Sequence, residues 1–170
     1  MTTTPGTEIK ACRICGSDSL REILDLGAQA LASLFPSPED PDPLPLPLHL
    51  LRCTDCGLVQ LRLTVNPAEM YTYGYGYRSG TNATMRGQLA GIVDWIGERC
   101  SVAGGDLVLD IGCNDGTLLK DYTVPGLERF GIDPIVGKFA DDYPPDITIH
   151  EGYFSTDTCS AVLGSKKAKV

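Results

Sequence analysis

Two cysteine pairs constrain the first part of this 170-residue chain more than any other feature of its sequence. Cys12 and Cys15 form one Cys-x-x-Cys-Gly motif, and Cys53 and Cys56 form a second. Two such motifs can supply four thiolates at tetrahedral positions, the ligand set that zinc favours in closed structural sites. The glycine that ends each motif allows the tight turn that points backbone N–H groups at sulfur. We therefore predict a structural Zn²⁺ site formed by these four cysteines.

Two other interpretations of the cysteines are less favoured. The chain has seven cysteines, an odd number, so complete disulfide pairing within it is impossible. A redox-active pair would lie at the strand-to-helix junction of a thioredoxin-like fold, and neither motif has that context. Cys100 and Cys159 are interpreted as core or incidental residues. The predicted metal is architectural, because a short segment with a long proline-rich stretch has few residues for a core.

Composition excludes several classes of partner. The formal net charge is −8, which argues against a broad basic face, so neither nucleic acid nor an anionic membrane is expected as a partner. The first ten residues lack the basic and apolar regions of a secretory signal, and no run approaches the roughly 20 apolar residues of a membrane span. We expect a cytoplasmic protein.

Proline is concentrated before the second cysteine pair. Six of the twelve prolines lie in the segment from Phe35 to Pro47. Because proline fixes φ and lacks an N–H, this segment is predicted to be extended over a surface, neither helical nor central in a sheet. Short strands are predicted at Leu20–Leu26, Leu48–Arg52 and Leu58–Leu63. Residues 1–70 are thus predicted to form a small β-rich zinc-binding domain.

Residues 71–105 are predicted to form a tyrosine-rich segment and a linking helix. The segment is irregular or strand-like, and its alternating tyrosines are Tyr71, Tyr73, Tyr75 and Tyr77. Thr81 or Asn82 can cap the helix, in which apolar residues recur at helical spacing from Met85 to Cys100.

From residue 106 onward the pattern is that of an α/β fold. Strands are predicted at Leu107–Ile111, Arg129–Ile132 and Ile147–His150, with helices beginning at Thr117 and Ile135. Such alternation indicates a parallel sheet. The last four residues look like the start of a fourth strand, whereas a doubly wound sheet has more strands. Residues 106–170 are therefore predicted to be the N-terminal part of a Rossmann-like domain that is truncated.

The turn after the first of these strands contains the residues suited to binding a ligand. It reads Asp110-Ile111-Gly112-Cys113-Asn114-Asp115-Gly116. Its glycines allow a sharp turn and close approach of a ligand, and the following helix presents free N–H groups. The motif is neither Gly-x-Gly-x-x-Gly nor a P-loop, which disfavours nicotinamide cofactors and nucleoside triphosphates. Asp133 ends the second strand, where a carboxylate can accept hydrogen bonds from ribose hydroxyls.

This combination resembles the cofactor site of class I methyltransferases, which use S-adenosylmethionine. The resemblance implies that the glycine turn contacts the methionine end of the cofactor. It implies that Asp133 holds the ribose and that the loop after the third strand borders the adenine. The residues assigned to the cofactor in this way are Asp110, Gly112, Cys113, Asn114, Gly116, Asp133, Tyr153 and Phe154.

The order of the motifs is more specific than any one of them. Seven features follow one another along the chain: the first cysteine motif, Asp25-Leu26-Gly27, the second cysteine motif with Leu-Val-Gln, the tyrosines, Ser79-Gly80, Thr84-Met85-Arg86 and the glycine turn. From about Cys12 to Phe154 this order resembles the N-terminal half of the zinc-containing sugar C-methyltransferases. The resemblance implies C-methylation of a small molecule, a nucleotide-linked 4-keto-deoxysugar, in secondary metabolism.

The same resemblance implies that Tyr75 and Tyr77 reach the sugar and serve in catalysis, since a phenol can donate to a keto oxygen. Aromatic packing over the glycine turn is the alternative for both. The family's general base, a histidine with an acidic neighbour, lies beyond Val170, which leaves open whether this chain alone turns over. A missing C-terminal half or a partner would cover the unfinished sheet. The alternative function is a non-catalytic zinc-binding module, or a cofactor-binding fragment, that docks a partner.

Overall fold

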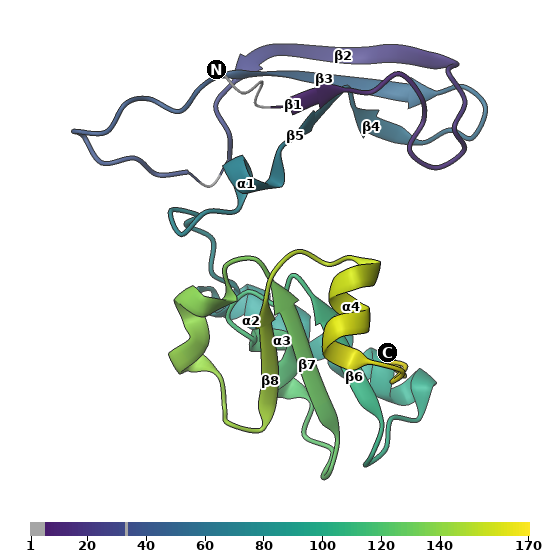
Figure 1. Cartoon of the computed structure of the whole chain (residues 1–170), viewed down its shortest axis with the longest axis vertical. Coiled ribbons are helices and arrows are strands. Elements are labelled where there is room, and N and C mark those ends of the chain that lie inside the picture. The colour runs from purple at the N-terminus through teal and green to yellow at the C-terminus, as the bar shows by residue number, and fades with distance from the viewer. Residues whose placement is uncertain (1–5, 33) are drawn as a thin grey trace. The chain divides into compact units, whose positions relative to one another are not determined.

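The computed structural model describes residues 6–32 and 34–170. The chain divides into two compact units, Met1–Gly76 and Tyr77–Val170, each with its own sheets (Figure 1). The chain mixes helices and strands, as predicted. None of the helices in the described ranges is long and apolar enough to cross a membrane.

The first unit is built from short antiparallel strands. Strands β2 (Leu20–Gln29), β3 (Leu46–Cys53) and β4 (Val59–Leu61) form one sheet in the order β2-β3-β4. Strands β1 (Gly6–Glu8) and β5 (Leu63–Val65) form a second sheet, and helix α1 (Pro67–Met70) follows. The strand predicted at Leu20–Leu26 is thus confirmed but extends further. The single strand predicted at Leu58–Leu63 is instead two strands that pair with different partners.

The prediction that the proline-rich segment stays out of the centre of a sheet is wrong at its end. Strand β3 is the central strand, and Pro47 pairs with Ala28 of β2 in its ladder. The proline is tolerated because β4 pairs only with Leu50–Arg52. On that side of β3, Pro47 therefore has no partner in β4 that would need its missing N–H.

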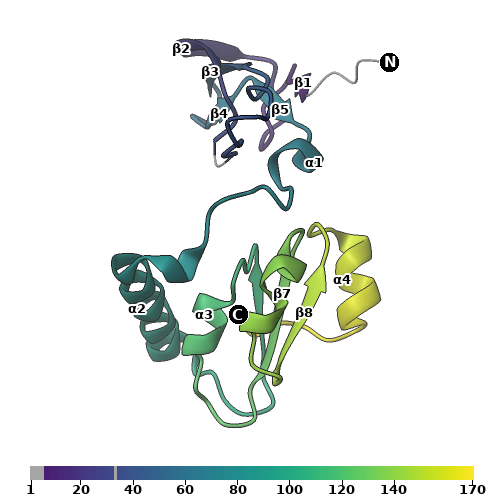
Figure 2. The same ribbon diagram turned by 90° about the vertical axis from the view of Figure 1, so that its left-hand side faces the viewer.

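The second unit is a three-stranded parallel sheet. Strands β6 (Leu107–Ile111), β7 (Glu128–Asp133) and β8 (Ile147–Glu151) lie in the order β6-β7-β8 and confirm the three strands expected there. Helices α2 (Ala83–Cys100) and α3 (Thr117–Asp121) lie on one side of the sheet, and α4 (Thr156–Leu163) lies on the other (Figure 2). The helix expected from Ile135 is a 3₁₀ helix, Val136–Asp142.

Alternation along the strands explains the two layers of helices, because successive side chains of a strand point to opposite faces. Val108 and Ile147 face the side on which Val93 of α2 and Leu119 of α3 complete one core. The opposite face contributes Leu107, Phe130 and Ile132, which pack against α4 through Cys159, Val162 and Leu163. Both faces of the sheet are therefore covered.

The C-terminal residues lie beside β6, on the edge away from β7. The Lys169 N–H donates to the Leu107 carbonyl over 2.8 Å, and the Leu109 N–H donates to the Val170 carbonyl over 2.9 Å. These bonds run in the parallel sense. They agree with the prediction that the last residues resemble the start of a fourth strand, although the pairing is too short to count among the strands.

Candidate metal centre and cofactor site

The four cysteines of the two motifs lie together in the first unit. The Sγ atoms of Cys12, Cys15, Cys53 and Cys56 all lie within 4.8 Å of one another. The Cys12–Cys56 and Cys15–Cys53 pairs of sulfur atoms are each 3.6 Å apart. Four sulfurs bound tetrahedrally at the usual Zn–S length would be about 3.8 Å apart. The chain therefore holds a soft, four-thiolate donor set that fits zinc.

The two motifs adopt the same backbone turn. The Gly16 N–H donates to the Cys12 carbonyl, and the Gly57 N–H donates to the Cys53 carbonyl, each over 3.0 Å. Both glycines have positive φ, +74° and +80°. This conformation favours glycine and turns successive N–H groups toward sulfur.

Those N–H groups favour the thiolate form that a metal needs. Hydrogen bonds from the backbone of Cys15 and Ile14 lower the pKa of Cys12 to about 6. A backbone hydrogen bond from Cys56 lowers the pKa of Cys53. One cysteine of each pair is thus prepared for metal binding by its own turn.

Two residues for which no individual role was predicted, Arg13 and Gln60, hold the first motif in place. The side-chain oxygen of Gln60, a residue 7% exposed, accepts from the Arg13 backbone N–H and from its guanidinium, both over 3.2 Å. Arg13 also donates to the Leu61 carbonyl over 2.8 Å and to the Thr64 hydroxyl over 2.7 Å. The sequence signals were the position of Arg13 between two ligands and the place of Gln60 in the Leu-Val-Gln that follows the second motif.

The glycine turn in the second unit follows β6 directly. Gly112 and Gly116 have φ of +80° and +72°, and Asn114 between them has φ of +50°. The Gly112 N–H donates to the Ile132 carbonyl over 2.8 Å, which joins the turn to the end of β7. A Cβ at Gly116 would lie 2.4 Å from the ring of Tyr143, so only glycine fits there.

The carboxylate of Asp133 stabilises the glycine turn through hydrogen bonds. Its carboxylate accepts from the Asn114 N–H over 3.1 Å and from the Ile135 N–H over 2.8 Å. Asp133 is only 7% exposed. Each oxygen keeps one further lone pair, so the group that holds the turn can still accept from a ligand.

Asp110 differs from Asp133 in having no hydrogen bond to its carboxylate from any part of the chain that the structure describes. Burial, reinforced by the negative charge of Asp133, raises the pKa of Asp110 to about 6. Two carboxylates therefore lie at the same edge of the sheet, and one of them lacks a donor. A ligand that brings a hydroxyl or an ammonium group would relieve this arrangement.

The side chain of Cys113 points into the core. Cys113 is 3% exposed and packs in the cluster with Val108 and Leu119. A Cβ at Gly131 would lie 2.6 Å from its Sγ atom. Burial raises the pKa of this thiol to about 12. Cys113 can thus offer a ligand its backbone, while its side chain belongs to the packing of the sheet.

Tyr143 is a further residue at the turn that the sequence analysis did not single out. Its hydroxyl donates to the Asn114 carbonyl over 2.9 Å and lies 3.3 Å from the Cys113 carbonyl. Burial raises the pKa of Tyr143, so the phenol stays protonated and remains a donor. The turn is therefore held on both sides, by Tyr143 and by Asp133.

The predicted aromatic residues fall in three places. Tyr153 and Phe154 follow β8 and are 43% and 52% exposed, and the Gly152 N–H before them donates to the Asp133 carbonyl over 3.2 Å. Tyr77 belongs to the second unit, where its carbonyl accepts from the Asn114 side chain over 3.1 Å. Tyr75 belongs to the first unit, where its ring centre lies 5.6 Å from that of Tyr71 with the two rings tilted by 58°.

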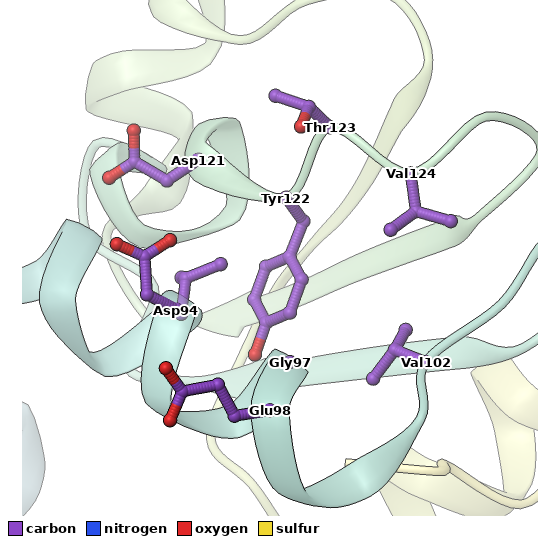
Figure 3. Close-up of a pocket in the computed structure, with 9 residues that line it drawn as sticks. Asp94, Gly97, Glu98, Val102, Asp121, Tyr122, Thr123 and Val124 are labelled. Atoms are coloured by element: carbon purple, nitrogen blue, oxygen red, sulfur yellow. The ribbon is translucent and has the colours of Figure 1, made fainter.

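A cavity of about 570 Å³ lies elsewhere in the second unit, between α2 and the end of α3 (Figure 3). Asp94 and Glu98 of α2, Asp121 of α3 and the adjoining Tyr122 are among its lining residues. It includes none of the residues predicted to bind the cofactor.

Comparisons with known proteins support the first unit as a zinc-binding domain. Residues 12–71 match a family model described as "Putative zinc binding domain". The chain is also 29% identical over 128 residues to the C-methyltransferase NovU of Streptomyces niveus. That match covers 74% of this chain and 30% of the relative's own length. Together with the four-cysteine cluster, these matches confirm that the chain resembles the zinc-containing C-methyltransferases, over a length that extends beyond the zinc-binding domain.

Proposed function

We propose that this chain forms the zinc-binding domain and the first part of the cofactor domain of a methyltransferase that uses S-adenosylmethionine. The observation that carries the proposal is the pair of carboxylates, Asp110 and Asp133, at the edge of the sheet where the glycine turn begins. Their chemistry calls for a ligand with hydrogen-bond donors, such as ribose hydroxyls and an amino group. The similarity to a C-methyltransferase supports the same assignment.

The topology of the second unit is compatible with this role. Three parallel strands with helices on both faces correspond to one half of a doubly wound, Rossmann-like sheet. In such sheets ligands bind outside the carboxyl ends of the strands. Asp110, the glycine turn and Asp133 all lie at those ends.

Each residue has a proposed role that its surroundings allow. Asp133 would accept from the ribose while it holds the turn, and Asp110 would accept from a second donor of the ligand. Gly112 and Gly116 leave room for close approach. Tyr153 and Phe154, both partly exposed, would border the adenine. Cys113 would face the ligand through its backbone, because its side chain packs in the core. Asn114 would contribute by shaping the turn, because its side chain, its N–H and its carbonyl are all bonded within the protein.

The proposed acceptor is a carbon next to the keto group of a nucleotide-linked deoxysugar, as the resemblance implies. When bound, S-adenosylmethionine supplies an electrophilic methyl group. A tyrosine hydroxyl would donate to the keto oxygen as negative charge develops there, and Tyr77 is the better placed candidate because its main chain is bonded to the glycine turn. Tyr75 stays a second candidate for this hydroxyl donor. The general base is not assigned to any described residue. Neither nucleic acid nor a membrane is proposed as a partner.

The zinc site is proposed to be structural. Four thiolates close the coordination sphere of zinc, so no position is left for a substrate. Its role would be to hold the first unit together, because few apolar side chains there are buried.

Calorimetric titration of the zinc-loaded chain with S-adenosylmethionine and S-adenosylhomocysteine tests the proposal. We expect saturable binding near one molecule per chain. Asp110→Asn should weaken binding about fivefold to tenfold, since one charged acceptor is lost. Asp141→Asn, a change at an exposed carboxylate, is the matched control. A folded, zinc-loaded chain that binds neither compound would favour a module that docks a partner instead.

A further inference from the structure

The main chain of Tyr77–Gly80 is bound to the glycine turn through side chains of that turn. The Asn114 side-chain oxygen accepts from the Ser79 N–H over 3.0 Å, and its amide donates to the Tyr77 carbonyl over 3.1 Å. The Asp115 carboxylate accepts from the Gly80 N–H over 2.9 Å. Three polar groups of one backbone segment are thus satisfied by two neighbouring residues of another.

These contacts are buried and closely fitted. Asn114 is 6% exposed and Asp115 is 1% exposed. A Cβ at Gly80 would lie 2.6 Å from the Asp115 carboxylate oxygen and 2.9 Å from the Thr117 hydroxyl. Any residue larger than glycine at position 80 would push the segment away from the turn. A loop that only passed the turn by chance would not need such close approach.

Arg78 extends this contact to a third segment. Its guanidinium lies 3.2 Å from the Asp115 carboxylate and 2.8 Å from the carboxylate of Asp142. The centre of the guanidinium is 5.6 Å from the ring centre of Phe139. Burial by itself raises the pKa of Asp115, but hydrogen bonds from Thr117, Gly80 and Arg78 outweigh it and lower the pKa. Asp115 is therefore a charged group that this segment neutralises.

We infer that Asn114, Asp115 and Arg78 are positioning residues that join Tyr77–Gly80 to the glycine turn, so that occupation of the turn and the placement of Tyr77 are coupled. The turn and the segment share hydrogen bonds, so neither can shift without breaking bonds to the other. Only the identity of the ligand in this inference rests on the proposed function. The junction itself rests on the contacts described above.

Amide hydrogen exchange, measured residue by residue by NMR on the zinc-loaded chain, tests the junction directly. The Ser79 and Gly80 N–H groups donate to side chains of the turn, so their protection reports these bonds alone. Asn114→Gly removes both side-chain bonds and keeps the positive φ of that position. We expect Ser79 exchange to become about tenfold faster, while amides of β7 keep their protection.

Two further variants guard against a general loss of structure. Asn114→Asp tolerates the same backbone and keeps the oxygen that accepts from Ser79, so it should restore most of the protection at Ser79. Ser101→Gly replaces the other non-glycine residue with positive φ among the described residues, and it should leave Ser79 unchanged. Unaltered Ser79 exchange in Asn114→Gly would overturn the inference.

Coupling is tested by adding S-adenosylhomocysteine to the same samples. In the unaltered chain, the ligand should slow exchange at Ser79 and Gly80, and Asn114→Gly should lose this effect at Ser79. If the compound binds by calorimetry without slowing either amide, the coupling is refuted. If it does not bind at all, the proposed function fails, while the junction is still decided by the variants without ligand.

Discussion

The two units of this chain use different means to stay folded. Among the described residues of the first unit, the buried apolar side chains are Cys12, Leu46, Leu51 and Cys53, and two of these four are candidate metal ligands. The second unit buries side chains from all three strands and from α2 and α3. The first unit thus depends on a cross-link at one place, the predicted metal site, whereas the second depends on apolar packing on both faces of a sheet.

This difference determines what each unit tolerates. Strand β2 illustrates the first case, because nearly all of its residues are exposed and its apolar Ile23 is 48% exposed. Strand β7 illustrates the second, because Ile132 is 1% exposed. Removal of the metal should damage the first unit selectively, and removal of core methyl groups should damage the second.

The largest expected effect is that of metal removal. Zinc binding in small domains of this kind contributes on the order of 10 kcal/mol to folding. Chelation, or Cys53→Ser, should release zinc and collapse the amide resonances of the first unit into the narrow random-coil range, while those of β6–β8 keep their native positions. Zinc quantification and NMR on one sample check this. Cys100→Ser is the control, and full zinc retention in Cys53→Ser would refute the four-thiolate site.

The second largest effect is expected from the core of the parallel sheet. Ile132→Ala should lower the free energy of unfolding of the second unit by about 2–5 kcal/mol, because it leaves a cavity between the sheet and α4. Thermal unfolding followed by NMR measures the stability of the second unit, and zinc quantification on the same sample should show no loss of bound metal. Ile23→Ala, on the exposed strand of the first unit, should cost less than about 0.5 kcal/mol. Equal costs at the two positions would contradict the comparison.

The stability of the second unit should depend on pH through the carboxyl group of Asp110. The pKa of Asp110 is raised from 3.8 to about 6, so the native state binds a proton more tightly than the unfolded state. Stability contributed by its neutral form is therefore lost as pH rises from about 4 to about 6. Asp110→Asn should stabilise the unit by about 1–3 kcal/mol above pH 6.

Denaturant titrations at pH 4 and pH 7 measure this effect. The gain from Asp110→Asn should be small at the lower pH and largest at the higher one. The same variant should bind the proposed cofactor more weakly. A gain that does not change with pH would show that the charge of Asp110 is not the cause.

The smallest effect is expected where the first cysteine motif meets β4. Arg13→Met keeps much of the side-chain length but removes the guanidinium bonds to Gln60, Leu61 and Thr64. Loss of these exposed or half-exposed bonds should cost about 1 kcal/mol and speed zinc release to a competing chelator about fivefold. The rate of transfer to a coloured chelator measures this, with Arg21→Met as a control. An unchanged rate would mean that Arg13 does not support the motif.

Much of each unit could be predicted from local patterns. The cysteine spacing identifies the four thiols, and the alternation of apolar runs and turns identifies β6, β7 and β8. The N-cap of α2 is Asn82, one of the two residues predicted for it. These features depend on neighbours in the sequence, such as a knuckle turn, a buried strand or a capping side chain, and so they are visible without the fold.

Other elements were missed although signals existed. Helix α4 is capped by Ser155, whose hydroxyl accepts from the Thr158 N–H, and its apolar residues recur at helical spacing. The rule that excluded proline from the centre of a sheet failed at Pro47, because that rule concerns missing ladder bonds and β4 is too short to form one there. The direction of the Cys113 side chain could not be predicted either, since it depends on the space left by Gly131 of another strand.

The sequence by itself determined which groups are available: four thiols, a turn with two glycines, and acidic residues at the ends of two strands. Only the tertiary structure decided which of these groups act on one another. Two strands place Asp110 and Asp133 at one edge of the sheet, where Asp133 holds the turn and its charge acts on Asp110. Arg78 likewise meets Asp115 and Asp142 across long stretches of chain. Covalent spacing controls contacts within a turn or a strand, whereas packing of the sheet and helices controls contacts between distant segments.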